Sequence, residues 1–540
     1  MVELIRQKEL FMKIALIGIN AKYIHPNLAI RLLKKNTSYN TDILEYTIKD
    51  SINKIIDDIL LYDIIAFSCY IWNIEIIKEI LTKIQNKNKT IILGGPEVSY
   101  NATYYINNNL ANYVIKNEGE EAFDLLLKYL DQKIKLDKIP NLYHKNGYTF
   151  DKLVDLENIK MAYDLLDDCN NKIMYIETSR GCPYKCGYCM ASLDNKLRFF
   201  NIEEIKNQIL LLKNKNAKTF KFLDRTFNAN KKFIELIDFI IENYKEGESY
   251  QFEITGDLLK PEYIDYINEK APKGLIRFEI GIQSTNIKTN ESVGRIQNNE
   301  LLFSNIKKIQ SANVIDLHLD LIAGLPYEDY KSFENTFNEV VALRPKELQL
   351  GFLKMLWGTR LAKESSKYGY ICDNKAPYEV IENLFMSKDD IKEIHIAEES
   401  FEVYYNSGLI KASTNIIFKY EKNIFDFYHQ LGDNLIKNKG LENIFIHIDN
   451  FLKNKPYYDE IHATLIYDYL NHFKIKPTAW WEERLSAGDK KSKLKLIHSN
   501  NLDKYNILDL YKYSILVELK DVYILGIYKP NEKKIEILKK

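Results

Sequence analysis

The sequence predicts an α/β protein in which an N-terminal Rossmann-like domain precedes a central partial (β/α)6 barrel and a C-terminal mainly helical domain. Three observations support this prediction. Short apolar segments alternate with helical segments from Met12 onward, a second alternating series begins at Ile173, and the alternation loses its regularity after Ala376. A parallel sheet covered by helices needs such alternation, and a chain of 540 residues is long enough for several domains.

The first series contains five candidate strands, each followed by a helical stretch. The strands are expected at residues 12–19, 41–46, 63–68, 90–93 and 112–115. In the helical stretch 74–85, isoleucine and leucine recur at intervals of three or four residues, which is the spacing of one helix face. We therefore expect a Rossmann-like domain over residues 1–130 and a less regular connector over residues 131–172, with a turn at Asn146-Gly147.

The second series contains six candidate strands, expected at residues 173–178, 219–223, 250–254, 275–281, 314–322 and 347–352. Six strand-helix repeats are three quarters of a complete eight-unit barrel, so an open barrel is expected over residues 173–375, with its chemistry at the carboxyl ends of the strands. Helical segments at 378–386, 391–405 and 423–431 then indicate a C-terminal domain over residues 376–540. The sequence does not reveal the role of this domain.

The composition argues against several classes of partner. The 75 Lys and Arg residues equal the 75 Asp and Glu residues in number, so no overall positive field favours nucleic acid or an anionic membrane surface. The chain shows neither a secretory leader pattern at its start nor an apolar run long enough to span a bilayer. Three of the six cysteines lie within eight positions, unlike a secreted disulfide framework. We expect a cytoplasmic protein with a small-molecule substrate of unknown identity.

Three cysteines follow the first barrel strand with the spacing Cys-x3-Cys-x2-Cys: Cys182, Cys186 and Cys189. Three thiolates on one loop can hold three irons of a 4Fe-4S cluster and leave the fourth iron open to a ligand that is not protein. A structural zinc loop is the alternative, but zinc needs four closed ligands, and neither Cys169 nor His144 is suitably placed in the sequence. The motif therefore favours a cluster with one open iron.

This motif resembles that of the radical S-adenosylmethionine (SAM) enzymes, which carry Cys-x3-Cys-x2-Cys after the first strand of a partial barrel. The resemblance implies that SAM chelates the open iron. It further implies that an electron from the reduced cluster, supplied under anaerobic conditions by a reductase such as flavodoxin or ferredoxin, splits SAM to a 5′-deoxyadenosyl radical.

The resemblance also assigns SAM contacts to six positions: Tyr188, Asp224, Glu253, Gln283, Arg295 and Asp320. It places Tyr188 against adenine and Glu253 against the methionine moiety. Gln283 and Asp320 correspond to ribose contacts, and Arg295 to the partner of the SAM carboxylate, which suits a guanidinium fork. Asp224 stands where the family commonly has a Gly-Gly-Glu loop, so its role is open.

The N-terminal domain resembles the cobalamin-binding module that precedes the barrel in one subclass of radical SAM enzymes. The matching stretches follow predicted strands, where ligands of open α/β folds bind. The candidate cobalamin contacts are Asn20, Tyr23, Ser68, Tyr70, Trp72, Gly94, Gly95, Pro96, Glu118 and Glu120. Tyr70 and Trp72 have two possible roles, covering the lower face of cobalt or packing in the core. The Asp-x-His-x-x-Gly signature is missing, so His25 is expected to pack or hydrogen-bond rather than ligate cobalt.

These features lead to a methyltransferase hypothesis, in which the adenosyl radical activates an unactivated carbon or phosphinate centre and cobalamin delivers the methyl group. One alternative is a cobalamin-dependent radical oxidase or cyclase without methyl transfer. Another is a non-catalytic cobalamin or redox sensor. A methylthiotransferase with a second cluster is excluded, because only Cys69 and Cys169 precede the motif. The sequence identifies no catalytic residue beyond the cofactor contacts.

Overall fold

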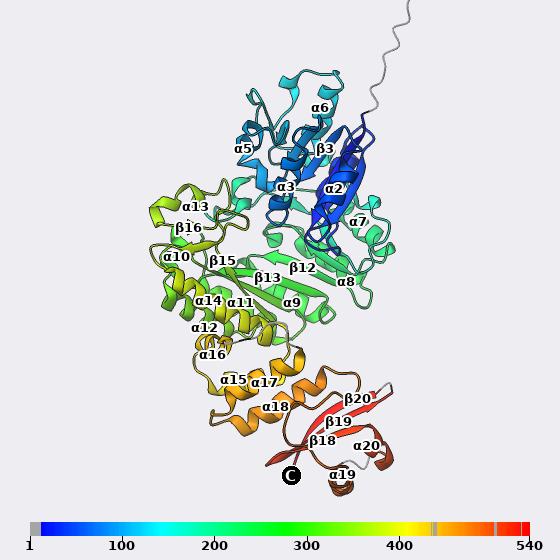
Figure 1. The fold of residues 1–540 in the computed structure, drawn as a ribbon, viewed down its shortest axis with the longest axis vertical. Helices are drawn as coiled ribbons and strands as arrows, with labels where there is room; N and C mark the ends of the chain where they lie inside the picture. The colour runs from blue at the N-terminus through cyan, green and yellow to red at the C-terminus, as the bar shows by residue number, and fades with distance from the viewer. Residues whose placement is uncertain (1–11, 434, 436–439, 502–504, 531) are drawn as a thin grey trace, which may run out of the picture. The chain divides into compact units, whose positions relative to one another are not determined.

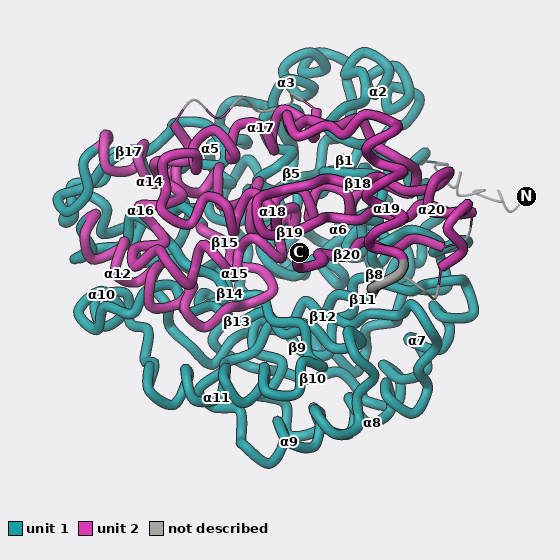
Figure 2. The backbone as a smooth tube through the Cα atoms, turned by 90° about the horizontal axis from the view of Figure 1, so that it is seen from below, with its two compact units in different colours: residues 1–329, 351–387 teal, residues 330–350, 388–540 magenta. Residues whose placement is uncertain are grey.

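The computed structural model describes residues 12–433, 435, 440–501, 505–530 and 532–540 (Figure 1). It divides into two compact units (Figure 2). The first comprises residues 1–329 and 351–387, and the second comprises residues 330–350 and 388–540. The expected absence of a leader concerns the start of the chain, and residues 1–11 lie outside the described residues.

The first sheet has seven strands in the order β2-β1-β3-β4-β5-β6-β7. Its strands are β1 (Ile14–Asn20), β2 (Asp42–Thr47), β3 (Ile64–Ser68), β4 (Thr90–Gly94), β5 (Tyr113–Ile115), β6 (Leu142–His144) and β7 (Gly147–Tyr148). The first five are parallel and lie within two residues of the predicted bounds. The last two form an antiparallel hairpin around the predicted Asn146-Gly147 turn, so part of the expected connector extends this sheet.

Helices cover both faces of the first sheet, because its central strands are apolar on both sides. On one face lie α2 (Ile52–Ile59), α3 (Ile74–Ile84), α4 (Pro96–Ser99) and α5 (Ala102–Asn107), and on the other lie α1 (Leu28–Asn36) and α6 (Glu120–Leu130). Strand β1 contributes Ile17 to the first core and Leu16 to the second, and all seven of its residues are buried. The Rossmann-like prediction is confirmed.

The second sheet has six strands in the order β15-β14-β13-β12-β11-β8. Its strands are β8 (Ile173–Ile176), β11 (Thr219–Phe222), β12 (Ser249–Ile254), β13 (Ile276–Gln283), β14 (Asp316–Ala323) and β15 (Glu347–Phe352). The intervening helices include α7 (Ile202–Asn214), α8 (Phe233–Glu242), α9 (Pro261–Lys270), α10 (Ile287–Ser292) and α11 (Asn299–Ser311). Neighbouring strands from β8 to β14 run parallel. This arrangement confirms the partial barrel.

The two faces of the barrel sheet differ in chemistry, because buried and half-buried residues alternate along β12 and β13. One face is aromatic: the rings of Phe220 and Tyr250 stack with centroids 4.5 Å apart. The other, which we call the inner face, is polar. Its register places Lys221 beside Gln251, and Gln251 beside Arg277. The sheet therefore presents rows of charged and amide groups on a rigid support.

The C-terminal region is largely helical, as predicted, and ends in a small sheet that the prediction missed. Its helices are α14 (Lys388–Phe401), α15 (Lys411–Tyr420), α16 (Ile424–Gly432), α17 (Leu441–Leu452), α18 (Tyr458–Asn471), α19 (Ala487–Asn501) and α20 (Ile507–Tyr513). The strands β18 (Ser514–Glu518), β19 (Val522–Lys529) and β20 (Glu532–Lys539) form an antiparallel sheet.

The expected helix at residues 378–386 is wrong. Tyr378 has a φ of 58°, in the left-handed region, so no right-handed helix can begin there. The segment instead forms β17 (Val380–Glu382), which pairs with β16 (Ile371–Cys372), and then turns where Asn383 Oδ1 accepts hydrogen bonds from two backbone N–H groups.

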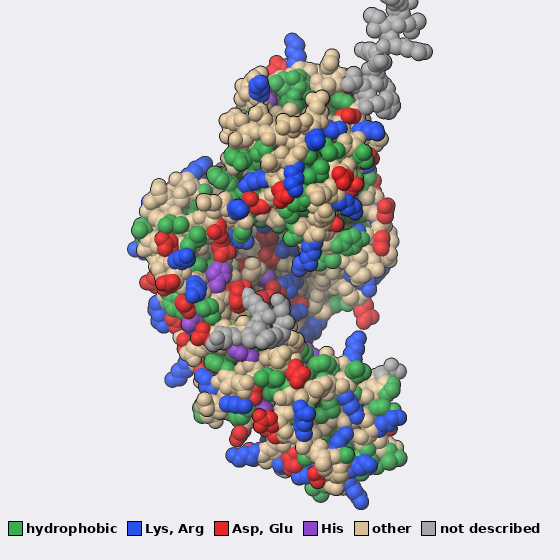
Figure 3. All heavy atoms as spheres, viewed as in Figure 1, with side chains coloured by type: hydrophobic (Ala, Val, Ile, Leu, Met, Phe, Trp, Pro, Cys, Tyr) green, Lys and Arg blue, Asp and Glu red, His purple; other side chains and the backbone are tan. Residues whose placement is uncertain are grey.

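No helix among the described residues is long and apolar enough to cross a membrane. On the face viewed in Figure 3, basic and acidic side chains are interspersed, which agrees with their equal numbers in the sequence.

Candidate functional site

The three cysteines of the motif lie on the loop that follows β9 (Ser179–Arg180). Cys182 and Cys186 are buried, Cys189 is half-buried, and all three are free thiols. Burial raises the pKa of Cys189, and the charges of Cys186 and Cys182 raise it further. Across the described residues, no group of three or more His, Cys, Asp or Glu side chains is arranged to hold a metal ion. The motif therefore places three free thiols on one loop, and a cluster with three thiolate ligands suits this donor set.

The start of this loop is held by Asp224, which lies just after β11. Its carboxylate accepts hydrogen bonds from Thr178 N (3.0 Å), Thr178 Oγ1 (2.6 Å) and Ser179 Oγ (2.5 Å). Burial raises the pKa of Asp224 to about 6, against the effect of these hydrogen bonds. The SAM contact expected of Asp224 stays a prediction, and the structure gives its carboxylate another task, which is to shape the cluster loop.

Gly181 fixes the next turn of the cluster loop. Its φ is 87°, and a Cβ atom added there would lie 2.6 Å from Lys196 O. Only glycine fits this position, because both the backbone conformation and the space exclude a side chain. The backbone N–H of Cys182 then donates to Asp194 O at 2.9 Å. The loop is therefore fixed just before the first cysteine and at its backbone N–H.

Arg295 and Tyr188, two of the predicted SAM contacts, lie together beside the cluster loop. Burial would lower the pKa of Arg295, but the charges of Tyr188 and Cys186 raise it. The Arg295 guanidinium also donates to Gln297 Oε1 (3.0 Å) and to Gly281 O. The side chain is thus held at the end of β13, where a carboxylate bound near the cysteines would find a guanidinium fork.

Gln283 ends β13 in an unusual conformation. Its φ is 68°, and the pairing of β13 with β14 shifts register between Gly281 and Gln283. Left-handed backbone at a residue other than glycine costs about 1 kcal/mol or more, and such strain gathers at ligand sites. The buried Oε1 atom of Gln283 has no hydrogen-bond partner among the described residues. An orphaned acceptor at this strand end fits a bound hydroxyl group, as predicted for the SAM ribose.

Glu253 and Asp320, the other two predicted SAM contacts, carry buried charges on the inner face. Glu253 forms an ion pair with Arg225 at 3.2 Å, and Asp320 Oδ1 lies 2.8 Å from His318 Nε2. Burial raises the pKa of both carboxyl groups, although their partners oppose the shift. The positive charge of Arg225 also acts on Cys189, whose pKa it lowers. Arg225 is therefore a site residue that the sequence reasoning missed, although it directly follows Asp224.

The predicted cobalamin contacts after β1 and β3 form a rim with exposed aromatic rings. Tyr70 and Trp72 stack with ring centroids 4.4 Å apart, and Trp72 is 45% exposed. Tyr23 is 76% exposed. The polar members are tied to the sheet, because Ser68 Oγ accepts from Asn27 Nδ2 (2.8 Å) and Asn20 Nδ2 donates to Glu45 Oε1 (3.0 Å). The Trp72 ring thus presents an open face to a flat ligand.

Gly94, Gly95 and Pro96 form the next part of the rim, after β4. Gly95 has a φ of 111°, and a Cβ atom there would lie 2.4 Å from Cys69 O. Pro96 occupies the first turn of α4, where its missing N–H costs nothing. Two loops of the rim therefore pack backbone to backbone.

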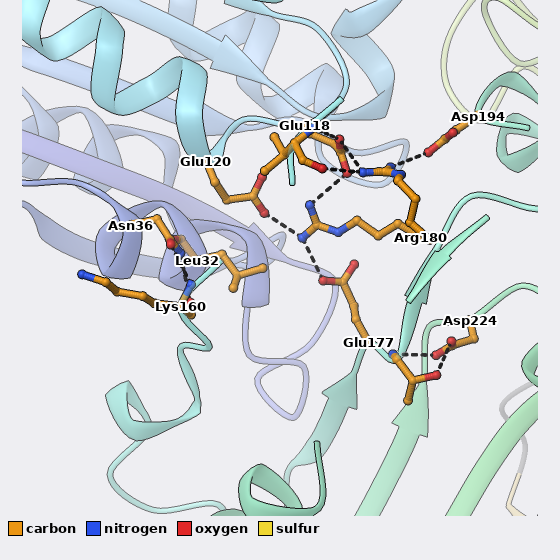
Figure 4. Close-up of polar contacts among 12 residues, drawn as sticks. Leu32, Asn36, Glu118, Glu120, Lys160, Glu177, Arg180, Asp194 and Asp224 are labelled. Carbon is orange, nitrogen blue, oxygen red and sulfur yellow. Dashed lines mark hydrogen bonds and ion pairs between the residues drawn. The ribbon is translucent and has the colours of Figure 1, made fainter. Parts of the chain in front are cut away.

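Glu118 and Glu120, the last two predicted cobalamin contacts, have partners on the cluster loop. Both accept hydrogen bonds from Arg180, and Glu118 also pairs with Arg198 at 2.9 Å (Figure 4). The sequence reasoning missed these pairs, because the partners lie 60 residues or more apart. His25 hydrogen-bonds through Nδ1 with Tyr175 OH at 2.7 Å, in agreement with the expected hydrogen-bonding role.

Comparison with known families decides the assignment of both sheets. Residues 176–340 match the family described as "Radical SAM superfamily", and residues 14–127 match "B12 binding domain". The chain belongs to the cobalamin-dependent radical SAM family. Residues 366–524 of this radical SAM enzyme match a family described as "Protein of unknown function (DUF4080)". The predicted cofactors, a 4Fe-4S cluster, SAM and cobalamin, are confirmed at the level of these families.

Two curated relatives are similar over about half of the enzyme. An uncharacterized methyltransferase of Pyrococcus horikoshii is 26% identical over 299 residues, which are 51% of this chain and 63% of that protein. The cobalamin-dependent radical SAM methyltransferase TokK of Streptomyces tokunonensis is 22% identical over 312 residues, 53% of this chain and 45% of that protein. The chain thus spans less than two thirds of the length of either relative.

Two solved structures share the fold. TsrM from Kitasatospora setae, solved with cobalamin and a [4Fe-4S] cluster bound, gives a TM-score of 0.55 at 14% identity, over 66% of this chain and 78% of that chain. The cobalamin-dependent SAM radical enzyme OxsB, solved with aqua-cobalamin bound, gives 0.58 at 16% identity, over 85% of this chain and 80% of that chain. At these identities the similarity establishes the fold.

We expect the substitution Asp224→Asn to weaken the cluster loop. An amide can replace only part of a carboxylate that accepts three hydrogen bonds, and a lost hydrogen bond to a charged group costs about 1.5 to 3 kcal/mol. Thermal unfolding of the apoprotein and iron and sulfide content after anaerobic reconstitution should both fall. The exposed Asp265→Asn serves as the control and should change neither. Unchanged unfolding and iron content in Asp224→Asn would show that Asp224 does not hold the loop.

Proposed function

We propose that the enzyme splits SAM reductively at a cluster held by Cys182, Cys186 and Cys189, and uses the resulting 5′-deoxyadenosyl radical to methylate a small-molecule substrate. One observation carries this proposal. The loop with three free thiols lies directly beside the guanidinium of Arg295, which provides a carboxylate site next to the only iron that these thiols would leave open.

When bound, the cluster supplies the electron that breaks the sulfonium bond, and cobalamin supplies the methyl carrier. The residues of this chain orient SAM. Arg295 binds the SAM carboxylate, and Gln283 and Asp320 accept hydrogen bonds from the ribose hydroxyls. Support comes from the unpartnered Oε1 of Gln283 and from the burial of these side chains at neighbouring strand ends. Glu253 receives the amino end of the methionine moiety, and the Tyr188 region receives adenine.

The inner face of the barrel provides the place where a substrate would meet the radical. Its charged groups have partners: Lys221 Nζ lies 3.1 Å from Glu279 Oε2, and Arg277 Nη2 donates a hydrogen bond to Nδ1 of His318 at 2.5 Å. Burial would raise the pKa of Glu279, but the charge of Lys221 lowers it, so Glu279 stays ionised. This face carries both positively and negatively charged side chains, and these have partners. It therefore suits a polar substrate whose own polar groups can replace those partners.

Methyl transfer is the part of the proposal for which the relatives provide the support, since both curated relatives are named as methyltransferases. The acceptor would be an unactivated carbon or a phosphinate centre, because such centres need radical activation. A cobalamin-dependent oxidase or cyclase without methyl transfer is the second candidate. A non-catalytic sensor is disfavoured, because it would not need the strained Gln283 or the Arg295 fork. A cytoplasmic location and a flavodoxin or ferredoxin partner stay predictions.

The substitution Cys186→Ala tests the cluster. The protein is reconstituted anaerobically with iron, sulfide and hydroxocobalamin, reduced, and mixed with SAM, and 5′-deoxyadenosine is measured. Wild type should form it, and Cys186→Ala should fall to the background level, since two thiolates cannot hold the cluster. Cys372→Ala, a half-buried cysteine on β16, should keep wild-type levels. If Cys186→Ala keeps splitting SAM, the site assignment is wrong.

A measurement without substrate separates methyl transfer from the alternative. Reduced protein loaded with cobalamin is incubated with SAM carrying a trideuterated methyl group. A methyltransferase moves that methyl to the corrin and releases S-adenosylhomocysteine, and both products should appear together in mass spectrometry. Protein prepared without cobalamin is the control and should release none. Formation of 5′-deoxyadenosine without any S-adenosylhomocysteine would instead support the oxidase or cyclase.

A further inference from the structure

Arg180 connects two parts of the first unit that carry different cofactors. It lies in β9, two residues before Cys182, and its side chain is 12% exposed. Its guanidinium donates to Glu118 Oε1 (3.2 Å), Glu120 Oε1 (2.7 Å) and Glu177 Oε2 (3.0 Å). Figure 4 shows these side chains converging from separate elements. Two of the three carboxylates follow β5 in the first sheet, and the third follows β8 in the second.

A second arginine shares one of these carboxylates. Arg198, in β10 (Arg198–Phe199), donates to both oxygens of Glu118, at 2.9 and 3.2 Å, and to Asp194 Oδ2 at 2.9 Å. Strand β10 pairs with β9, so both arginines lie on the same hairpin as the cluster loop. Glu118 Oε2 also accepts a hydrogen bond from Val154 N at 2.8 Å. The network thus joins four carboxylates to two guanidinium groups across the boundary between the two sheets.

The energetics of this network indicate that it positions its residues rather than stabilising the fold. Glu118 and Glu120 keep only 11% and 6% of their side chains exposed. Removing several charges from water costs about as much as their pairing returns, so apolar residues could hold the same interface at least as well. A guanidinium with three carboxylates, in contrast, accepts only one arrangement of its partners, because its donors form a rigid planar fork.

We propose that Arg180 is a positioning residue that sets the separation between the cluster loop and the cobalamin rim, acting through Glu118 and Glu120. The inference rests on the proposed function, since it requires both cofactors. Glu118 and Glu120 leave the end of β5, next to the rim formed after β3 and β4. Arg180 directly precedes the Gly181 turn of the cluster loop. A shift of this ion cluster would therefore move the thiols relative to the rim.

The test compares Arg180→Gln with Arg180→Lys in the full-length protein loaded with cluster and cobalamin. Pulsed electron paramagnetic resonance measures the dipolar coupling between the reduced cluster and cob(II)alamin, which falls with the cube of their separation. Wild type should give one narrow coupling. Arg180→Gln should shift or broaden it beyond the wild-type width, because three carboxylates lose their shared cation. Arg180→Lys keeps the charge but loses the planar fork of the guanidinium, so its coupling should lie between those of wild type and Arg180→Gln.

Two further variants separate positioning from loss of stability. Glu120→Gln should change the coupling in the same direction as Arg180→Gln, and the double variant should be no worse than the single ones, because both remove one interaction. Lys213→Gln breaks the buried ion pair between Lys213 in α7 and Glu248 just before β12, which measures 3.0 Å. It should lower the unfolding temperature and leave the coupling as in wild type.

The outcomes distinguish this inference from the proposed function. If wild type binds both cofactors and Arg180→Gln shows the wild-type coupling, the positioning role is wrong and the proposed function stands. If Lys213→Gln alters the coupling as strongly as Arg180→Gln, the effect is one of general stability and the inference fails. If wild type holds no cluster or no cobalamin, the proposed function itself fails.

Discussion

The site depends on how many irons of a cluster one short loop can ligate. Three thiols between residues 182 and 189 can occupy three irons of a four-iron cluster and no more, so the fourth iron is left for a ligand from outside the protein. The surrounding features serve this arrangement. Asp224 and Gly181 fix the course of the loop before its first cysteine, and Arg295 places a cation beside Cys186, where the proposed function has it bind the SAM carboxylate.

On the inner face of the barrel, charged side chains are likewise held by partners. Most of its ionised groups have partners within the chain, as in the pairs Glu253–Arg225 and Lys221–Glu279. A buried charge without a partner would cost free energy, so these pairs stabilise the charged side chains of the face before a ligand binds. Gln283 differs, because its buried Oε1 has no partner in the part of the chain that the structure describes and its backbone is strained. The ion-paired side chains therefore stabilise the inner face, whereas Gln283 offers an acceptor to a ligand.

Much of the fold could be predicted because it is encoded locally. The apolar period of each segment predicted the parallel strands of the first sheet to within two residues, and Asn146-Gly147 marked the hairpin. The helix expected at 378–386 failed because its start is left-handed at Tyr378, which residue composition does not reveal. The strands β18 to β20 were missed because their alternation lies in a stretch rich in Lys and aromatic residues, although Pro530 marks the turn between the last two.

The site was predictable where one motif contains the chemistry, and not where chemistry depends on distant partners. The cysteines are visible in the sequence, whereas the pairing of Glu118 with Arg180 joins residues 62 positions apart. Asp224 likewise bonds residues 45 and 46 positions away, and no local pattern signals such contacts. Their roles emerge only once both sheets are folded.

The most direct test of the open iron is electron-nuclear double resonance of the reduced, reconstituted protein with SAM labelled with ¹⁷O in its carboxylate and ¹⁵N in its amino group. The account predicts strong hyperfine couplings to both labels, because both atoms bind the iron that the thiols leave free. Couplings too weak for direct ligation, in protein that binds SAM and retains an intact cluster, would contradict it.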